Sequence, residues 1–414
     1  MNLLDIYKRV RKYGLSGVVL WARIKFDNWK ARRWYLRNAA KFPLKPEPGV
    51  TIVADVVGKG SLAKVMRDLA LDIHEAGIPL QVFCPGAGVD PSESGVLSLL
   101  VDEADFRINK YSMVIDMFNG MEVPDGVAYK HATVAFWEFG DGFRQVYPGF
   151  PEKKWVIGMS DFDVEVFRRE LPRSVKVSKL LYPFRPLTGK LLPKTEVRKR
   201  FGIPKGAFAV FFNFDLGSGF GRKNPDGAIR AFAKAFRDDQ DAVLVFKTMR
   251  AKSYPQRVAA LERLADELGL GKRLIMVHSF VSNEELYGLT NACDVYLSLH
   301  RGEGFGLGIA EAMSMGKAVV VTDYSSTTEF CKKDNAFLVP YELVEVPKTQ
   351  DHLTYTYVTK WADPDVEIAA EGLRKLYADA TYRNEMGCAA KAFVENYFSI
   401  DNFRRSVEKL IDGE

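Results

Sequence analysis

The sequence predicts an α/β protein built from two doubly wound, Rossmann-like domains that face each other across a cleft. Its 414 residues are more than one compact core usually holds. Short apolar runs alternate with amphipathic stretches over residues 51–321, as strands and helices do around a parallel sheet. The alternation pauses once, at Tyr182-Pro-Phe-Arg-Pro186, so we expect a hinge near residues 185–195.

The first domain is expected over residues 47–190. A stiff linker, Pro43-Leu-Lys-Pro-Glu-Pro48, precedes it, because three prolines within six residues cannot continue a helix. Apolar runs predict strands, and amphipathic stretches predict helices. The expected strands are 51–57, 80–83, 113–117, 127–137 and 154–157, and the expected helices are 62–76 and 162–170.

The second domain is expected over residues 191–395, followed by a closing helix within 396–414 that continues an amphipathic stretch beginning at Lys391. Each domain should bind ligands where its strands end, because the carboxyl ends of parallel strands form the crevice of such sheets. The expected strands are 208–214, 242–248, 274–278, 295–298 and 318–321, and the expected helices are 224–236, 256–268, 283–290 and 308–315.

The composition is that of an ordinary globular protein, with 47% hydrophobic and 27% charged residues. The four cysteines are far apart in the sequence, and the five histidines are scattered. Neither set has the spacing of a zinc site or of a disulfide framework. We therefore expect a reducing, cytoplasmic compartment and no bound metal.

Residues 1–46 are strongly basic and aromatic. They carry twelve Lys or Arg against two acids, and three of the six tryptophans. Two interpretations stay open: a helix at the membrane interface, as indoles and cations favour, or a basic helix packed on its own domain. The longest uncharged run has nine residues, too few to cross a bilayer. The remaining 368 residues sum to −5, so no nucleic-acid partner is expected.

A glycine loop follows the first expected strand. Gly58-Lys-Gly60 satisfies the first part of a dinucleotide fingerprint, but no acid ends the next strand, where a ribose would be held. We interpret Gly58 and Gly60 as a loop that admits a ligand or a turn, and we keep both as candidate donor-binding residues.

Two glycine-rich loops of the second half each lead into an expected helix. One ends in Arg222 and Lys223, and the other spans Gly302 to Gly308. Main-chain amides, a helix N-terminus and cations together favour an anion. Because both loops follow strands of one sheet, they should converge on one ligand, and a pyrophosphate fits this pattern.

Two glutamates lie eight residues apart around the second loop. Glu311 is expected about one turn into a helix, where its carboxylate can accept both hydroxyls of a ribose. Without a partner, a carboxylate beside Ala310 and Met313 would be costly to bury. Glu303 precedes the helix and should reach the mouth of the cleft, where a sugar would lie.

These motifs resemble the signature of retaining glycosyltransferases of family 4, glycosyl transferases group 1, which have the GT-B fold. The core of the resemblance is Glu-x7-Glu within residues 299–313. Ala135-Phe-Trp-Glu-Phe139 is similar to a Trp-Glu motif of mannosyl- and rhamnosyltransferases that assemble polysaccharides. Further matches are Arg222-Lys-Asn-Pro225, Val321-Thr-Asp-Tyr-Ser325 and Trp361-Ala-Asp-Pro-Asp365.

The resemblance implies roles for individual residues. Glu311 would hold the ribose, Arg222 and Lys223 the diphosphate, and Glu303 would lie near the donor sugar. Glu138 and His131 are acceptor-side candidates, although a core histidine is an equal interpretation of His131. Backbone amides toward phosphate and sugar would come from Gly304, Phe305, Gly306 and Leu307.

The expected activity is that of a retaining hexosyltransferase in cell-surface polysaccharide biosynthesis. It would move a mannose- or rhamnose-like sugar from a GDP-, UDP- or dTDP-linked donor to a glycan, lipid-linked at the inner face of the membrane. No metal is expected, and Asp161-Phe-Asp163, which imitates a metal motif, is expected to cap a helix. The alternatives are a GT-B nucleotide-sugar epimerase or hydrolase, and a non-catalytic protein that binds nucleotide-sugars.

Overall fold

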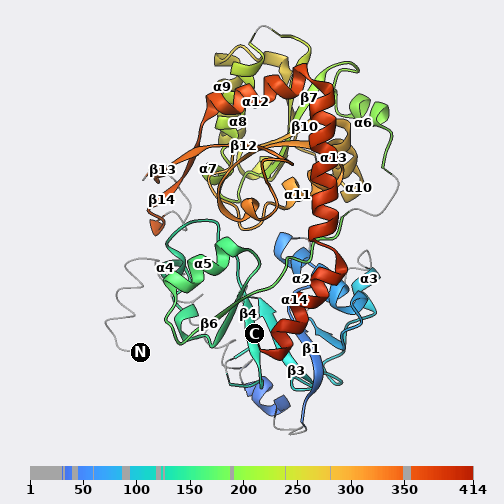
Figure 1. Ribbon diagram of the computed structural model, residues 1–414, viewed down its shortest axis with the longest axis vertical. Helices are drawn as coiled ribbons and strands as arrows, with labels where there is room; N and C mark the ends of the chain where they lie inside the picture. The colour runs from blue at the N-terminus through green and yellow to red at the C-terminus, as the bar shows by residue number, and fades with distance from the viewer. Residues whose placement is uncertain are drawn as a thin grey trace. The chain divides into compact units, whose positions relative to one another are not determined.

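The computed structural model describes residues 30–413, apart from 31–32, 40–44, 59, 86–93, 118–122, 125, 187–190, 238, 280 and 348–355 (Figure 1). The chain forms two compact units. Unit 1 contains the described residues of Met1–Val134, with Lys153–Val156 and Val407–Glu414. Unit 2 contains those of Ala135–Glu152 and Ile157–Ser406.

The first sheet has six strands in the order β2-β1-β3-β4-β5-β6. The pairs of β1 with β2, β1 with β3, and β3 with β4 are parallel. The strands are β1 (Glu47–Val53), β2 (Leu80–Phe83), β3 (Tyr111–Met117), β4 (His131–Val134), β5 (Trp155–Gly158) and β6 (Lys176–Lys179). The accompanying helices are α2 (Ser61–Glu75), α3 (Ser94–Leu97), α4 (Phe143–Val146) and α5 (Asp161–Glu170).

The second sheet, within unit 2, also has six strands, in the order β12-β11-β10-β7-β8-β9, and its pairs are parallel. The strands are β7 (Phe208–Asp215), β8 (Ala242–Met249), β9 (Leu274–Val277), β10 (Val295–Ser298), β11 (Ala318–Thr322) and β12 (Phe337–Val339). The order reverses between β7 and β10, so a ligand is expected beyond their carboxyl ends.

Helices cover this second sheet, and α12 contacts α8 while α13 contacts α11 and β11 (Figure 1). Asn224 and Pro225 start α8 as the sequence predicts, because Asn224 Oδ1 accepts a hydrogen bond from the amide of Gly227. The helices are α6 (Lys194–Arg200), α7 (Phe220–Lys223), α8 (Pro225–Ala235), α9 (Pro255–Glu267), α10 (Asn283–Ala292), α11 (Leu307–Ser314), α12 (Val366–Ala378) and α13 (Ala380–Tyr397).

Several boundaries differ from the sequence prediction. β1 ends at Val53 rather than at residue 57, because Asp55 Oδ1 accepts hydrogen bonds from the amides of Val57 and Gly58 and so forms a turn. The strand expected over 127–137 is only the four residues of β4. The tail beyond Lys391 divides between the end of α13 and a second helix, α14 (Ile400–Asp412).

Some elements have no counterpart in the sequence prediction. The main one is an antiparallel hairpin of β13 (Tyr341–Glu345) and β14 (Lys360–Pro364). Asp161 and Asp163 do not cap α5, because the cap is Ser160, whose hydroxyl accepts from the amide of Asp163. The expected capping role of these two aspartates was therefore wrong, although the helix does begin there.

The basic N-terminal segment is described only at residues 30, 33–39 and 45–46. Residues 33–39 are helical, and the Trp34 ring stacks on Phe83 and Phe106 of unit 1. The side-chain amide of Asn38 donates to the carbonyl of Phe106 at 2.8 Å. This part of the segment packs on its own unit, whereas the membrane prediction for residues 1–29 lies outside the described residues.

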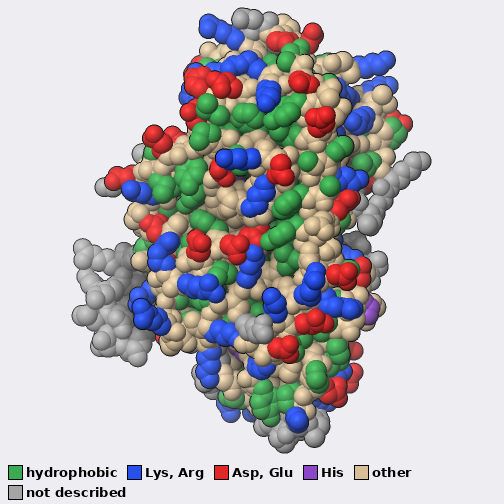
Figure 2. Space-filling view, viewed as in Figure 1, with side chains coloured by type: hydrophobic (Ala, Val, Ile, Leu, Met, Phe, Trp, Pro, Cys, Tyr) green, Lys and Arg blue, Asp and Glu red, His purple; other side chains and the backbone are tan. Residues whose placement is uncertain are grey.

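Lys and Arg side chains are interspersed with Asp and Glu over the face drawn in Figure 2. No helix in the described part of the chain is both long enough and apolar enough to cross a bilayer.

Candidate functional site

Four charged side chains of unit 2 meet at the reversal point of the second sheet, beyond β7 and β10. Lys223 Nζ lies 2.5 Å from Glu303 Oε1, and Arg222 Nη1 lies 3.2 Å from Glu303 Oε2. Arg222 Nη2 also lies 3.5 Å from Glu138 Oε1. We call Glu138, Arg222, Lys223 and Glu303 the charged quartet. Three members come from the two loops predicted to converge, and the fourth from the Trp-Glu segment.

The short helix α7 aims both adjacent cations at one carboxylate. Glycine in the left-handed region starts it, with a φ of 67° at Gly219, and Asn224 ends it with a φ of 54°. The carbonyl of Arg222 accepts from the amide of Arg301, and Asn224 Nδ2 donates to the carbonyl of Leu299. The loop after β7 is therefore fastened to the loop after β10.

Glu303 is buried and ionised. Burial alone would raise its pKa, but Lys223 and Arg222 outweigh burial and lower the pKa to about 2. Its amide donates to Ser325 Oγ at 2.8 Å, and its carbonyl accepts from the amide of Ser326 at 3.3 Å. The segment after β11 therefore fixes the backbone of Glu303 through both its amide and its carbonyl.

His300 links the start of the same loop to the segment after β11. The sequence analysis did not name it as a site residue. Its Nε2 lies 3.1 Å from the carbonyl of Tyr324, which can only accept, so Nε2 carries the proton. Its Nδ1 lies 3.2 Å from Ser298 Oγ. Burial lowers the pKa of His300 to about 4, so the ring is neutral at physiological pH. Its position two residues after a strand end is the signal that the sequence offered.

Two glycines of the loop are required by close packing. A Cβ on Gly302 would lie 2.1 Å from the carbonyl oxygen of Glu138. Any side chain at position 302 would therefore push Glu138 away from the loop that carries Glu303. Gly306 has a φ of 90° and precedes α11. The glycines therefore bring backbone segments together in addition to exposing amides, the role inferred from sequence.

The amides of Gly304, Phe305, Gly306 and Leu307 donate no hydrogen bond to another described residue. Phe305 itself is anchored, because its ring stacks on Tyr182 with centroids 3.5 Å apart and an interplanar angle of 4°. Residues 304–307 therefore form an anchored turn at the start of α11. The N–H groups of this turn are available to an acceptor.

Glu311 lies on α11 and is 9% exposed. Its Oε1 accepts a hydrogen bond from the hydroxyl of Tyr287 on α10, at 3.0 Å. Nearby, the hydroxyl of Tyr296 donates to Asn213 Oδ1 at 2.5 Å. Burial and the charges of Glu303 and Glu311 raise the pKa of Tyr296 well above its usual value. Tyr287, Tyr296 and Asn213 belong to this polar group, but their sequence positions gave no indication of it.

The remaining predicted site residues belong to unit 1. Gly58 donates to Asp55, and the carbonyl of Gly58 accepts from Arg67 of α2. Gly60 precedes α2 as its N-cap. His131 Nε2 lies 2.9 Å from Asp116 Oδ2, and both side chains are buried. In this unit His131 is thus paired with a buried carboxylate.

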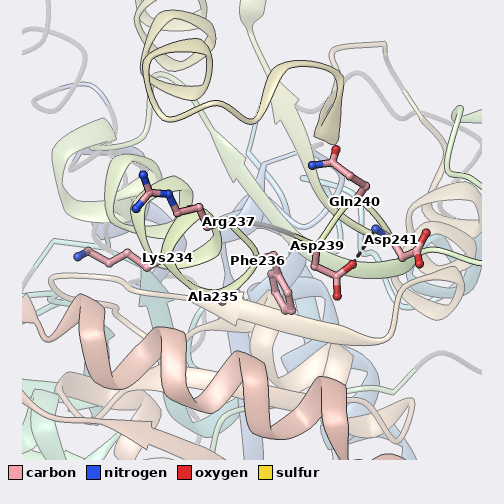
Figure 3. Close-up of a pocket in the computed structure, with 7 residues that line it drawn as sticks. All are labelled: Lys234, Ala235, Phe236, Arg237, Asp239, Gln240 and Asp241. Carbon is pink, nitrogen blue, oxygen red and sulfur yellow. Dashed lines mark hydrogen bonds between the residues drawn. The ribbon is translucent and has the colours of Figure 1, made fainter.

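In the described residues, no three His, Cys, Asp or Glu side chains are arranged to hold a metal ion. A surface hollow of about 580 Å³ lies at the other end of the second sheet (Figure 3). Residues from the end of α8 to just before β8 line it: Lys234, Ala235, Phe236, Arg237, Asp239, Gln240 and Asp241. Strand β8 begins there, so the hollow is remote from the carboxyl ends where the quartet lies.

Comparisons with known proteins show which sequences and structures this chain is similar to. Residues 194–346 match the family model of glycosyl transferases group 1. The serotype-specific mannosyltransferase WbdA of Escherichia coli is 27% identical over 135 residues, a match that covers 31% of this chain and 16% of WbdA. The matched part of the chain therefore spans about a sixth of that relative's length.

Solved structures share the fold over most of the chain. A glycosyltransferase from Rickettsia africae ESF-5 has a TM-score of 0.61 at 15% identity, covering 90% of this chain and all of the other. Anabaena Alr3699/HepE in complex with UDP-glucose has a TM-score of 0.63 at 14% identity, covering 88% of this chain and all of the other. The predicted α/β architecture with two parallel sheets is confirmed. The chain has the GT-B fold, and within it residues 194–346 match the family model of glycosyl transferases group 1.

Proposed function

We propose that the protein is a retaining glycosyltransferase that moves a sugar from a nucleotide-diphosphate donor to a glycan. The observation that carries the proposal is the charged quartet, which borders the available amides of residues 304–307. Two cations and a row of N–H donors beside a helix N-terminus suit a diphosphate.

The chemistry follows from where charge develops. When the bond between the sugar and the diphosphate breaks, negative charge accumulates on the leaving phosphate oxygen. Arg222, Lys223 and the amides of the turn are already fixed in place, so they stabilise that charge more than they stabilise the ground state. We propose that no metal is needed, because donor sugar hydroxyls would take over the contacts of Glu303 and leave Lys223, Arg222 and the turn amides for the leaving phosphate; EDTA should leave turnover unchanged.

The donor's remaining parts fit the other polar residues. Glu311 accepts from Tyr287 and is proposed to accept the ribose hydroxyls as well. Glu303 is proposed to contact the donor sugar, and Glu138 the acceptor side. Retention of configuration would follow if the acceptor hydroxyl attacks the sugar carbon on the face that the diphosphate leaves. The leaving phosphate would take the proton of that hydroxyl.

The match to WbdA, named as a mannosyltransferase, favours mannose or a similar hexose as the sugar. HepE was solved with UDP-glucose, which makes a nucleotide-sugar the first donor class to test. We further propose a glycan acceptor, lipid-linked at the cytoplasmic face of the membrane, in polysaccharide assembly.

The test begins with thermal unfolding in the presence of UDP, GDP, dTDP, ADP and CMP, which identifies the base. The matching nucleotide-sugars are then incubated with and without glycan acceptors. Formation of a new glycosidic bond, whose anomeric configuration equals that of the donor by NMR, supports the proposal. Epimerised or hydrolysed donor with every acceptor would favour the other GT-B activities. Absence of stabilisation by every nucleotide and every nucleotide-sugar would end the proposal.

A further inference from the structure

The cations of the charged quartet are already neutralised without any ligand. Glu303 contacts Lys223 at 2.5 Å and Arg222 at 3.2 Å, and Glu138 lies 3.5 Å from Arg222. Two positive and two negative side chains sum to zero. A site built only to capture a diphosphate would leave its cations unpaired, so the two carboxylates need an explanation.

Glu303 cannot easily leave the cations. It is 6% exposed, and hydrogen bonds to Ser325 and Ser326 hold its backbone on both sides. Its pKa is lowered to about 2 by Lys223 and Arg222 against the effect of burial, so it stays ionised at physiological pH. Any phosphate that reaches Lys223 must therefore approach a fixed negative charge.

A bare nucleotide diphosphate and a nucleotide-sugar differ in what they present to that charge. The terminal phosphate of the bare nucleotide carries only oxygens, which repel a carboxylate at short range. A sugar on that phosphate removes one charge and brings hydroxyl groups. These can donate to Glu303 the hydrogen bonds it gives up when Lys223 turns to the phosphate.

We infer that Glu303, aided by Glu138, is a specificity-determining residue that selects the sugar-bearing nucleotide over the bare nucleotide diphosphate. The inference rests on the proposed function and adds to it a discrimination against the product of the reaction. The carboxylates lower affinity for the spent nucleotide, and the same contacts favour the intact donor.

The test is Glu303→Gln, which keeps the shape and removes the charge. Isothermal titration calorimetry measures the affinities of inorganic pyrophosphate, UDP, GDP and their sugar conjugates for the full chain. We expect the variant to bind pyrophosphate and the recognised nucleotide diphosphate about tenfold more tightly than the wild type. Its affinity for the nucleotide-sugar should change less, so the preference for the conjugate falls.

The matched control is Glu371→Gln, which removes a charge from the exposed face of α12 and should leave all affinities unchanged. Equal or weaker binding of pyrophosphate by folded Glu303→Gln overturns the inference. If that variant does not fold, Glu138→Gln decides, because the Glu138 side chain is 31% exposed and the substitution changes no buried packing. Tighter pyrophosphate binding supports the inference, and unchanged binding overturns it.

The two proposals fail in different ways. Absence of nucleotide-sugar binding by the wild type contradicts the proposed function. Normal donor binding by the wild type, together with an unchanged preference in both glutamine variants, contradicts only the selection by the carboxylates.

Discussion

Glu311 is a carboxylate on an otherwise apolar helix, flanked by Ala310 and Ala312, which are fully buried. It accepts from Tyr287 at 3.0 Å, a bond that holds the side chain in one orientation. A fixed carboxylate is a strong acceptor for vicinal hydroxyls, because hydrogen bonds to charged groups contribute about 1.5–3 kcal/mol each.

Replacing Glu311 by Ala should weaken binding of the recognised nucleotide at least about tenfold, because the charged acceptor of the ribose is lost. Calorimetry with the ribonucleotide and its 2′-deoxy analogue provides the measurement. The wild type should distinguish the two ligands and Glu311→Ala should not. Tyr287→Phe is the control, which keeps the carboxylate and should cause a smaller loss. Unchanged affinity in Glu311→Ala would remove the proposed ribose contact.

His300 determines part of the pH dependence of stability. Burial lowers its pKa from 6.5 to about 4, so the folded protein binds fewer protons there than the unfolded chain does between these values. The stability is therefore complete above pH 6.5 and is lost as the pH falls towards 4. Glu303 acts in the same direction at lower pH, because its pKa is also lowered.

We expect the free energy of unfolding to fall by about 3 kcal/mol between pH 6.5 and pH 4 through His300 alone, since 2.5 pKa units are involved. Urea unfolding at several pH values measures this slope. His300→Gln cannot titrate and should flatten the curve over this interval. A slope identical in the wild type and the variant would show that other groups control it.

At the scale of elements, the loop after β10 is positioned by close contacts to its backbone. Gly302 lies against the carbonyl of Glu138, and Arg222 Nη1 donates to the carbonyl of Gly302 at 2.7 Å. The loop, the Trp-Glu segment and α7 are thereby held together within unit 2. This arrangement explains why Glu138 belongs to the quartet although it is distant in sequence.

Gly302→Ala should lower the free energy of unfolding by roughly 2 kcal/mol or more, because its Cβ would lie 2.1 Å from a backbone oxygen. It should also abolish turnover, since Glu138 and Arg222 would be pushed apart. Gly60→Ala is the control, because a Cβ there meets nothing within 4 Å. Thermal and urea unfolding report the difference, and equal stability of the two variants would contradict this account of the loop.

At the scale of the whole molecule, the charge asymmetry of the chain resides in its first 46 residues. Residues 33–39 pack on unit 1 through Trp34 and Asn38. Six Lys or Arg, with Trp21 and Trp29, lie in residues 1–29. The membrane hypothesis therefore concerns residues 1–29, while the interpretation of a helix packed on its own domain holds for 33–39.

Deletion of residues 1–29 should abolish flotation with anionic liposomes, because the basic and aromatic side chains that favour the interface are removed. It should leave the thermal unfolding midpoint nearly unchanged, since the contacts of Trp34 and Asn38 remain. A companion variant replaces the six basic residues by Gln. It should weaken flotation without shortening the chain, which separates the effect of charge from that of length. Flotation that persists after the deletion would contradict the hypothesis.

The sequence by itself determined the alternation of strands and helices, and with it the two parallel sheets. It also predicted that the loops carrying Arg222, Lys223 and Glu303 converge, because both loops follow strands of one parallel sheet. Residues 33–39, the hairpin of β13 and β14, and the end of β1 could not be assigned from sequence, since their conformation depends on contacts with distant residues.

Only the tertiary structure decided how the charges are shared. Adjacent Arg222 and Lys223 reach the same carboxylate because left-handed residues at both ends of α7 set its direction. Tyr287 joined the polar group around Glu311 through a contact between two helices that no spacing reveals. Spacing along a chain specifies which elements form, whereas the pairing of buried charges depends on distances that exist only after the elements have packed.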